Sequence, residues 1–287
     1  MNKLGIICSL HPFSKPYHSQ CINSFNAQTD KDFLLILFND GANIPKSVSK
    51  QIEVISNKVT DLSPGKIKEK GVRIAQESDC DYIAIIDSDD TMVANRVEQI
   101  KNYIGVNYSY SFIHNLNTID ENDNILKKDI FDLSHDNYLF DFFLNKNISG
   151  FGNTIYKVED IFPLIPFPED VIALDWYLAV FIAMRNGFSV LNESLVNYRQ
   201  HGGNIAGINE NYTPEKLNNL IKIRDLHYHY LLKDLFDNGD NKNYYLDKIK
   251  NEKNYWENKK KEISSDIRNY LSIMNDKGDH LLWHQII

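Results

Sequence analysis

Short apolar runs alternate with stretches of helical character through the first third of the chain, and this alternation constrains the fold most strongly. The apolar runs have the length of strands and cover Leu4–Leu10, Phe33–Asn39, Ile52–Ser56 and Tyr82–Ile86. The stretches of helical character are Tyr17–Gln28, Lys66–Glu77 and Thr91–Ile104. This order predicts an α/β fold with a mostly parallel sheet flanked by helices. Sheets of this kind bind ligands at the carboxyl ends of their strands.

The end of the chain has a different character, with helical spacing only. Thr213 and Pro214 form a helix start, and apolar residues follow at helical spacing as far as Leu232. A second helical stretch covers Tyr244–Met274. We therefore predict a domain over residues 1–210 and a helical C-terminal appendage over residues 211–287. An apolar helical stripe needs a surface to cover it, so the first helix should pack on the preceding domain.

Composition limits the partners of the chain. Its formal net charge is -8, which argues against nucleic acid binding through a broad basic surface. To bind an anionic ligand, a chain with this net charge would need a local positive charge, such as a bound cation. Cys8, Cys21 and Cys80 match no zinc motif, which favours reduced thiols. With no secretion signal and no apolar run of membrane length, we expect a cytoplasmic protein.

Three carboxylates crowd the end of the fourth predicted strand, in Asp87-Ser88-Asp89-Asp90. Carboxylate oxygens suit Mg²⁺ or Mn²⁺, and a cation would relieve their mutual repulsion. The alternative interpretation is a helix cap, with Asp89 or Asp90 capping a helix that begins near Thr91. The position after a parallel-type strand favours the metal site.

Acidic residues also lie at the ends or starts of other predicted elements. Asp40, in the turn Asn39-Asp40-Gly41, could accept hydrogen bonds from a base or ribose, although an ordinary turn is the alternative. Asp175 begins an apolar helix, where it suits a general base beside Trp176 or a helix cap. Glu169 and Asp170 are rival candidates for the base.

A basic and glycine-containing run follows the last predicted strand, in Tyr198-Arg199-Gln200-His201-Gly202-Gly203-Asn204. The glycines would let the backbone approach a phosphate closely. Arg199 could contact that phosphate, and His201 could complete a metal site.

Taken in order, these motifs resemble the family 2 inverting glycosyltransferases of GT-A fold, over about residues 3–207. The runs Asp175-Trp176-Tyr177-Leu178 and Tyr198-Arg199-Gln200-His201 are most similar to bacterial rhamnosyltransferase-like members. The resemblance implies a general base at Asp175, and a Mn²⁺ or Mg²⁺ ion at Asp89 and His201. It implies acceptor contacts at Gly152 and Trp176. The implied nucleotide-sugar site consists of Leu10, His11, Pro12, Asp40, Asp87, Ser88 and Arg199.

The resemblance also implies a reaction and partners. The donor would be a UDP- or dTDP-linked sugar, and the acceptor a hydroxyl of a glycan or lipid-linked glycan in bacterial surface polysaccharide assembly. One departure lies before the Asp-x-Asp strand, where many members carry Ala-Arg-Asn-x-Gly. This chain has Ile67-Lys68-Glu69-Lys70-Gly71, so Glu69 stands in place of the asparagine.

Two other functions remain as alternatives. Asp87-Ser88-Asp89-Asp90-Thr91 also matches the first motif of haloacid-dehalogenase-like phosphatases, in which Asp87 would be the nucleophile. Three strands precede it here, whereas that motif normally ends the first strand of its domain. The other alternative is a GT-A-like protein that only binds.

For the second tail stretch we expect self-association, or a weak contact at the inner face of the membrane.

Overall fold

The computed structural model describes residues 2–42, 47–106, 110–133, 137–138, 140–202, 204, 213–235 and 241–276. Ten strands form one sheet, in the order β3-β2-β1-β4-β9-β6-β10-β5, with β7 beside β6 and β8 beside β10. The strands are β1 Leu4–Leu10, β2 Leu34–Asn39, β3 Glu53–Lys58, β4 Tyr82–Asp87, β5 Thr91–Met92, β6 Phe112–Ile119, β7 Ile125–Lys127, β8 Asn137–Tyr138, β9 Thr154–Lys157 and β10 Phe188–Arg199.

Parallel pairing dominates the sheet. The long pairs β1–β2, β1–β4, β2–β3 and β6–β10 are parallel. The antiparallel pairs, such as β4–β9 and β5–β10, are short. The predicted α/β architecture is therefore confirmed, and the carboxyl ends of β1, β2 and β4 meet at one edge of the sheet.

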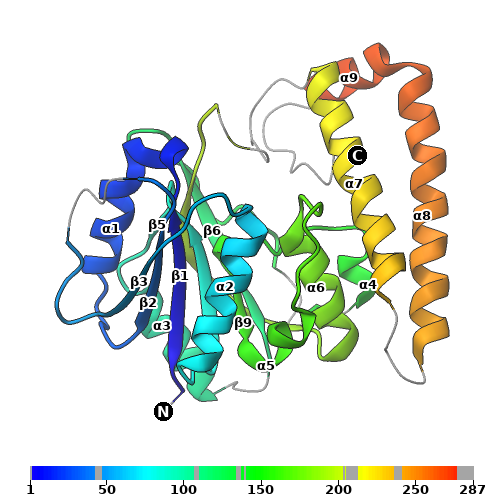
Figure 1. The fold of residues 1–287 in the computed structure, drawn as a ribbon. Coiled ribbons are helices and arrows are strands. Elements are labelled where there is room, and N and C mark those ends of the chain that lie inside the picture. The colour runs from blue at the N-terminus through cyan, green and yellow to red at the C-terminus, as the bar shows by residue number, and fades with distance from the viewer. Residues whose placement is uncertain are drawn as a thin grey trace.

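Helices cover both faces of this sheet (Figure 1). They are α1 His18–Asn26, α2 Pro64–Glu77, α3 Arg96–Val106, α4 Phe140–Phe143, α5 Val158–Ile161, α6 Leu174–Arg185, α7 Pro214–Asp234, α8 Lys242–Ser265 and α9 Ile267–Asp276, with short 3₁₀ turns at Pro12–Tyr17, Phe151–Asn153 and Phe162–Leu164. Alternate residues of β1 enter two apolar cores. Ile6 and Cys8 pack in the core that contains residues of α1 and α3, and Ile7 packs in the core that contains residues of α2 and α6.

Helix α2 lies unusually close to β1 because of one glycine. A Cβ atom built on Gly71 would lie 2.7 Å from Cγ2 of Ile7, closer than carbon atoms can pack. The small residue therefore allows α2 to approach β1 closely at this point. This approach brings the first turns of α2 beside the end of β4.

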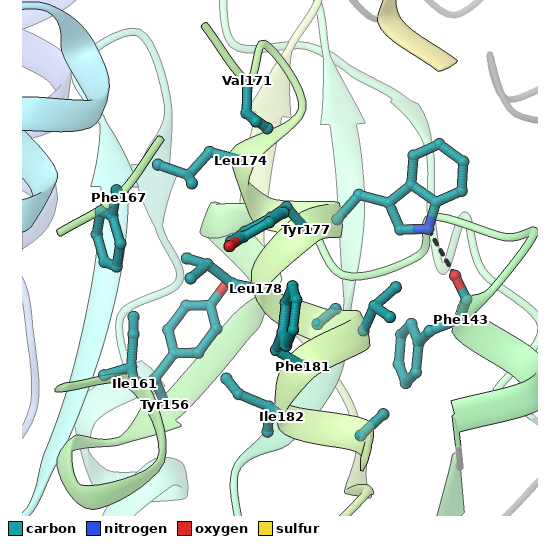
Figure 2. Packing of buried hydrophobic residues seen from close by; sticks show 14 of the residues in the cluster. Phe143, Tyr156, Ile161, Phe167, Val171, Leu174, Tyr177, Leu178, Phe181 and Ile182 are labelled. Atoms are coloured by element: carbon teal, nitrogen blue, oxygen red, sulfur yellow. Dashed lines mark hydrogen bonds between the residues drawn. The ribbon is translucent and has the colours of Figure 1, made fainter. Parts of the chain in front are cut away.

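Helix α6 is apolar on every side and is buried accordingly. Figure 2 shows Tyr156, Ile161 and Phe167 packed on one side of α6 and Phe143 on another. The remaining side is covered by α7 from the C-terminal appendage, and α8 runs beside α7 (Figure 1).

Side-chain contacts hold α7 against α6. Trp176 of α6 stacks on His227 of α7, with ring centroids 3.6 Å apart. The hydroxyl of Tyr177 donates to Asp234 at 2.9 Å. Helix α7 thus packs where the sequence analysis expects the first tail helix to pack. The predicted boundary near residue 210 falls within 205–212, outside the described residues.

Among the described residues, no helix combines the length and apolarity needed to cross a bilayer.

One predicted helix begins later than expected. The sequence predicts a helix from Thr91, but Thr91 and Met92 form β5 and pair with Val196 and Asn197 of β10. Helix α3 begins at Arg96. The prediction is wrong for the first residues because a contact distant in sequence outweighs local helical preference.

Candidate active site

Two adjoining cavities lie at the carboxyl ends of β1, β2 and β4. The first has a volume of about 630 Å³, and its lining includes Ser9, His11 and Asp40. The second has a volume of about 550 Å³, and its lining includes Phe151 and Asp175. Both are lined by Pro64, Lys68, Asp87 and Asp89. These four residues therefore form a shared edge between the two cavities.

The first cavity gathers most of the predicted nucleotide site. Nε2 of His11 lies 3.5 Å from a carboxylate oxygen of Asp40, so the ends of β1 and β2 are in contact. Ser88 also lines this cavity, and its hydroxyl lies 2.6 Å from that of Ser14. The exposed ring of Phe13 stacks beside His11, with centroids 5.1 Å apart.

Three residues of the predicted nucleotide site do not line that cavity: Leu10, Pro12 and Arg199. The side chain of Leu10 is fully buried in the core of β1, and its carbonyl accepts a hydrogen bond from the backbone N–H of Asp40. Pro12 begins the 3₁₀ turn Pro12–Tyr17. The side chain of Leu10 therefore points into the core and not to a ligand, and the contact predicted at Pro12 stays a prediction.

The shared edge contains a lysine that the sequence analysis does not single out. Nζ of Lys68 lies 3.3 Å from a carboxylate oxygen of Asp87 and 4.8 Å from the centre of the Phe151 ring. Lys68 follows Pro64 by four residues, so both lie on one face of α2. The four-residue spacing alone predicts that Lys68 and Pro64 share a face of α2. The sequence does not show that this face lies against the end of β4, so Lys68 could not be assigned to the site.

Asp89 and His201 come together across the site although they are far apart in sequence. A carboxylate oxygen of Asp89 lies 2.9 Å from Nε2 of His201. The His201 ring lies against Tyr17, with centroids 5.3 Å apart. A carboxylate and an imidazole are suitable ligands for Mn²⁺, and a carboxylate is suitable for Mg²⁺. Among the described residues, no group of three or more His, Cys, Asp or Glu side chains could hold a metal ion.

Arg199 has a different place from the one predicted. Its side chain is fully buried and donates hydrogen bonds to the carbonyl of Asp89 at 2.7 Å and the carbonyl of Asp120 at 2.8 Å. It also pairs with the carboxylate of Asp123 at 2.5 Å. The guanidinium is occupied by protein partners, so the predicted phosphate contact of Arg199 does not fit this geometry.

The same arginine joins the two loops that carry the candidate metal ligands. Its backbone N–H donates to Asp90 at 2.8 Å, and its carbonyl accepts from Asn204 at 2.9 Å. The side chain of Asn204 in turn accepts from the backbone N–H of His201. Arg199 and Asn204 therefore fix the position of His201 relative to Asp89.

The carboxylates of Asp87, Asp89 and Asp90 lie in three different environments. Asp87 is half exposed, Asp89 faces His201, and Asp90 is buried. Burial, followed by the neighbouring charges of Asp89 and Asp87, raises the pKa of Asp90 well above its usual range. Asp90 does not cap a helix, because it accepts the N–H of Arg199 instead.

Gly152 contacts two buried charged residues, Arg96 and Asp90. Its carbonyl accepts a hydrogen bond of 2.8 Å from the fully buried side chain of Arg96. A Cβ atom on Gly152 would lie 3.7 Å from a carboxylate oxygen of Asp90. Its neighbour Phe151 lines the second cavity. The acceptor contact predicted at Gly152 stays a prediction.

Asp175 lines the second cavity from the first turn of α6. Its carboxylate accepts hydrogen bonds from the N–H of Trp176 at 2.7 Å and from the side chain of Asn147 at 3.5 Å. Burial raises the pKa of Asp175 to about 6, while the N–H of Trp176 and the charge of Lys68 oppose that rise. A carboxylate with a pKa near neutrality suits a general base.

Trp176 points away from the cavity. It is fully buried, its indole N–H donates to the carbonyl of Phe143 at 2.6 Å, and its ring lies on His227. Successive residues of a helix differ by about 100° in direction, so Asp175 and Trp176 face different surroundings. The prediction that Trp176 contacts the acceptor is wrong.

Other acids near the site have structural partners. Glu69, the departure noted in the sequence, is almost buried and accepts hydrogen bonds from Arg73 at 2.9 Å and from the N–H of Phe167 at 3.1 Å. Glu169 lies 3.7 Å from Lys66, and Asp170 accepts from the hydroxyl of Tyr230 at 3.0 Å. Both lie on the rim of the second cavity and are exposed, whereas Asp175 is recessed.

No known family of proteins matches this sequence, and no curated protein sequence is similar to it. Solved structures of TarS from S. aureus are similar to this chain in fold, at 15% sequence identity. TarS residues 1–349 in complex with UDP-GlcNAc give a TM-score of 0.63, with 87% of this chain and 72% of that chain covered. The corresponding values are 0.59, 87% and 71% for the same TarS segment alone. They are 0.56, 85% and 69% for its complex with UDP. The chain thus has a GT-A-like glycosyltransferase fold, as the order of its motifs predicts.

Proposed function

We propose that this protein is an inverting, metal-dependent glycosyltransferase that moves a sugar from a UDP- or dTDP-linked donor to a hydroxyl of a glycan or lipid-linked glycan. One observation carries the proposal. Two cavities share an edge at Asp87, Asp89 and Lys68, and the recessed Asp175 lines only the second. This arrangement suits a donor in one cavity and an acceptor in the other, with their reacting groups meeting at the edge.

The first cavity suits the nucleotide. His11 and Asp40 offer hydrogen-bonding groups to a base or ribose at the ends of β1 and β2. The ring of Phe13 offers an apolar surface beside them. TarS structures contain UDP-GlcNAc or UDP, which supports a uridine nucleotide as the first donor to test.

The diphosphate then lies at the shared edge, beside Lys68 and the pair Asp89–His201. A divalent ion held by Asp89 and His201 would offset the negative charge that develops on the leaving diphosphate. Lys68 supplies a fixed positive charge at the same edge.

Asp175 acts on the acceptor. Its carboxylate takes the proton from the acceptor hydroxyl while that oxygen forms a bond to the anomeric carbon of the donor sugar. The bond from the anomeric carbon to the diphosphate breaks on the opposite face, and the nucleoside diphosphate leaves with its electron pair. Attack from the side opposite the leaving group inverts the configuration, and no covalent enzyme intermediate is needed.

A donor screen tests the proposal. Purified protein is incubated with UDP-, dTDP- and GDP-sugars and Mn²⁺, and released nucleoside diphosphate is measured with wild type and with Asp175→Asn. We expect release from at least one donor by the wild type only. Thermal stabilisation by the matching nucleoside diphosphate should require the metal.

The screen also separates the alternatives. A phosphatase that uses Asp87 would release inorganic phosphate from phosphate esters, and Asp175→Asn would not affect that rate. A protein that only binds would be stabilised by a nucleotide without any turnover. Either result would overturn the proposed function.

A further inference from the structure

The lining of the second cavity combines polar and aliphatic side chains. Asp87 and Asp89 lie on the shared edge, and Asn147 donates a hydrogen bond of 3.5 Å to Asp175. The aliphatic side chains come from the segment before α6, from the start of α6 and from α7, and we name them the aliphatic wall: Val171, Ile172, Leu174, Leu220 and Ile223. The wall therefore combines residues of the first domain with residues of the appendage.

The two parts of the wall are held together by packing and hydrogen bonds. Leu220 and Ile223 are 4% and 6% exposed, so α7 presents them from a packed interface. Asp170, two residues before Ile172, accepts a hydrogen bond of 3.0 Å from Tyr230 of α7. Figure 2 shows Leu174 at the start of α6 and Val171 just before it. The wall is thus a preformed surface, with Ile172 as its exposed member at 46%.

An aliphatic wall discriminates between ligands. A second sugar placed against it would lose hydrogen bonds from its hydroxyls to water and gain none from Val171, Ile172 or Leu220. An alkyl or aryl group at the same place would bind more favourably, because its apolar surface is removed from water. The wall therefore favours an apolar substituent on the acceptor.

The charges around the second cavity favour an uncharged substituent. Among the described residues that line it, Lys68 is the only cation and five are carboxylates: Asp87, Asp89, Glu169, Asp170 and Asp175. Glu169 and Asp170 directly precede Val171 of the aliphatic wall, so their charges would repel phosphate or carboxylate groups on a ligand that lies there.

We infer that the acceptor is a glycoside whose aglycone is apolar and uncharged, and that this aglycone lies on the aliphatic wall while the sugar hydroxyl reaches Asp175. The inference rests on the proposed function, because it takes the second cavity as the acceptor site. It assigns the selection of acceptors to Ile172, Leu220 and Ile223.

The test compares methyl and octyl glycosides of the same sugars, glucose and N-acetylglucosamine, below the critical micelle concentration of the octyl compounds. Dissociation constants are measured by calorimetry in the presence of UDP and Mn²⁺. We expect the octyl glycosides to bind at least about tenfold more tightly, which corresponds to burial of about two methylene groups. Ile172→Ser should remove most of that preference, and because Ile172 is exposed, this change leaves the fold intact.

The control is Ile125→Ser, since Ile125 is 53% exposed on β7 and lines neither cavity. It should leave the octyl preference unchanged. Equal affinity for the two glycosides, or an octyl preference that persists in Ile172→Ser, would overturn the inference. An octyl preference that depends on Ile172 without sugar transfer from any donor would instead count against the proposed function alone.

Discussion

Asp175 should lose its proton near pH 6, and the rate of transfer should rise across that pH. Burial raises the pKa of this carboxyl from 3.8 to about 6, which corresponds to a penalty of about 3 kcal/mol on its charged form. A general base works only when deprotonated, so activity is lost as the pH falls through 6. At pH 5 about a tenth of Asp175 is charged, against about nine tenths at pH 7.

The perturbation that tests this reasoning is Lys68→Met. The charge of Lys68 lowers the pKa of Asp175, together with the N–H of Trp176 and the side chain of Asn147, while the charge of Asp87 raises it. Without Lys68, the acid limb of the pH profile should move to higher pH. The assay is kcat/KM for the donor between pH 4.5 and 8, which reports the pKa values of the free enzyme.

A matched control is available on the other side of the molecule. The side chain of Lys101 has the same exposed fraction as that of Lys68, 15%, but Lys101 pairs with Asp30 and Asp32 and lines neither cavity. Lys101→Met should leave the acid limb in place. An acid limb below about pH 5 in the wild type, or one that Lys68→Met does not move, would refute the assignment. Asp175→Asn with more than about a tenth of wild-type turnover would refute it as well.

Asp89→Ala and His201→Ala should each weaken Mn²⁺-dependent UDP binding by about tenfold or more, measured by thermal shift against UDP without metal; equal stabilisation in both variants and wild type would contradict the metal site. Trp176→Phe should lower the free energy of unfolding by about 1–3 kcal/mol, measured in thermal melts, because the indole hydrogen bond is lost. The KM for the acceptor should not change, and a raised KM would show that Trp176 does contact the acceptor. Truncation after residue 212 should expose the surface that α7 covers and cause aggregation in size-exclusion chromatography; a soluble monomer of full stability would contradict this.

The strand ends could be predicted from the sequence because they depend on local pattern. The apolar runs that become β1, β2 and β4 determine which residues follow each strand. Because these strands are parallel neighbours, His11, Asp40 and Asp87 are expected at the same edge of the sheet. Asp89 and His201 were paired through a resemblance in motif order, and the structure brings them to 2.9 Å.

The errors share a physical cause, which is that side-chain direction depends on distant partners. Arg199 looked suited to a phosphate, but the carbonyls of Asp89 and Asp120 occupy its guanidinium. Trp176 adjoins Asp175 in sequence but turns to α7, which the motif resemblance did not cover. Asn147 was missed because it lies between elements, where no periodic pattern marks a residue.

The two cavities draw on different parts of the chain. The first is lined by residues between Ile7 and Asp89, together with His201. The second adds residues between Asn147 and Ile223 to the shared edge. Under the proposed function, substitutions after Asn147 would change the acceptor while the donor pocket keeps its lining, apart from His201. Exchange of that later segment between related genes would then combine a new acceptor preference with the old donor, so diversity of products could arise by recombination at a single junction.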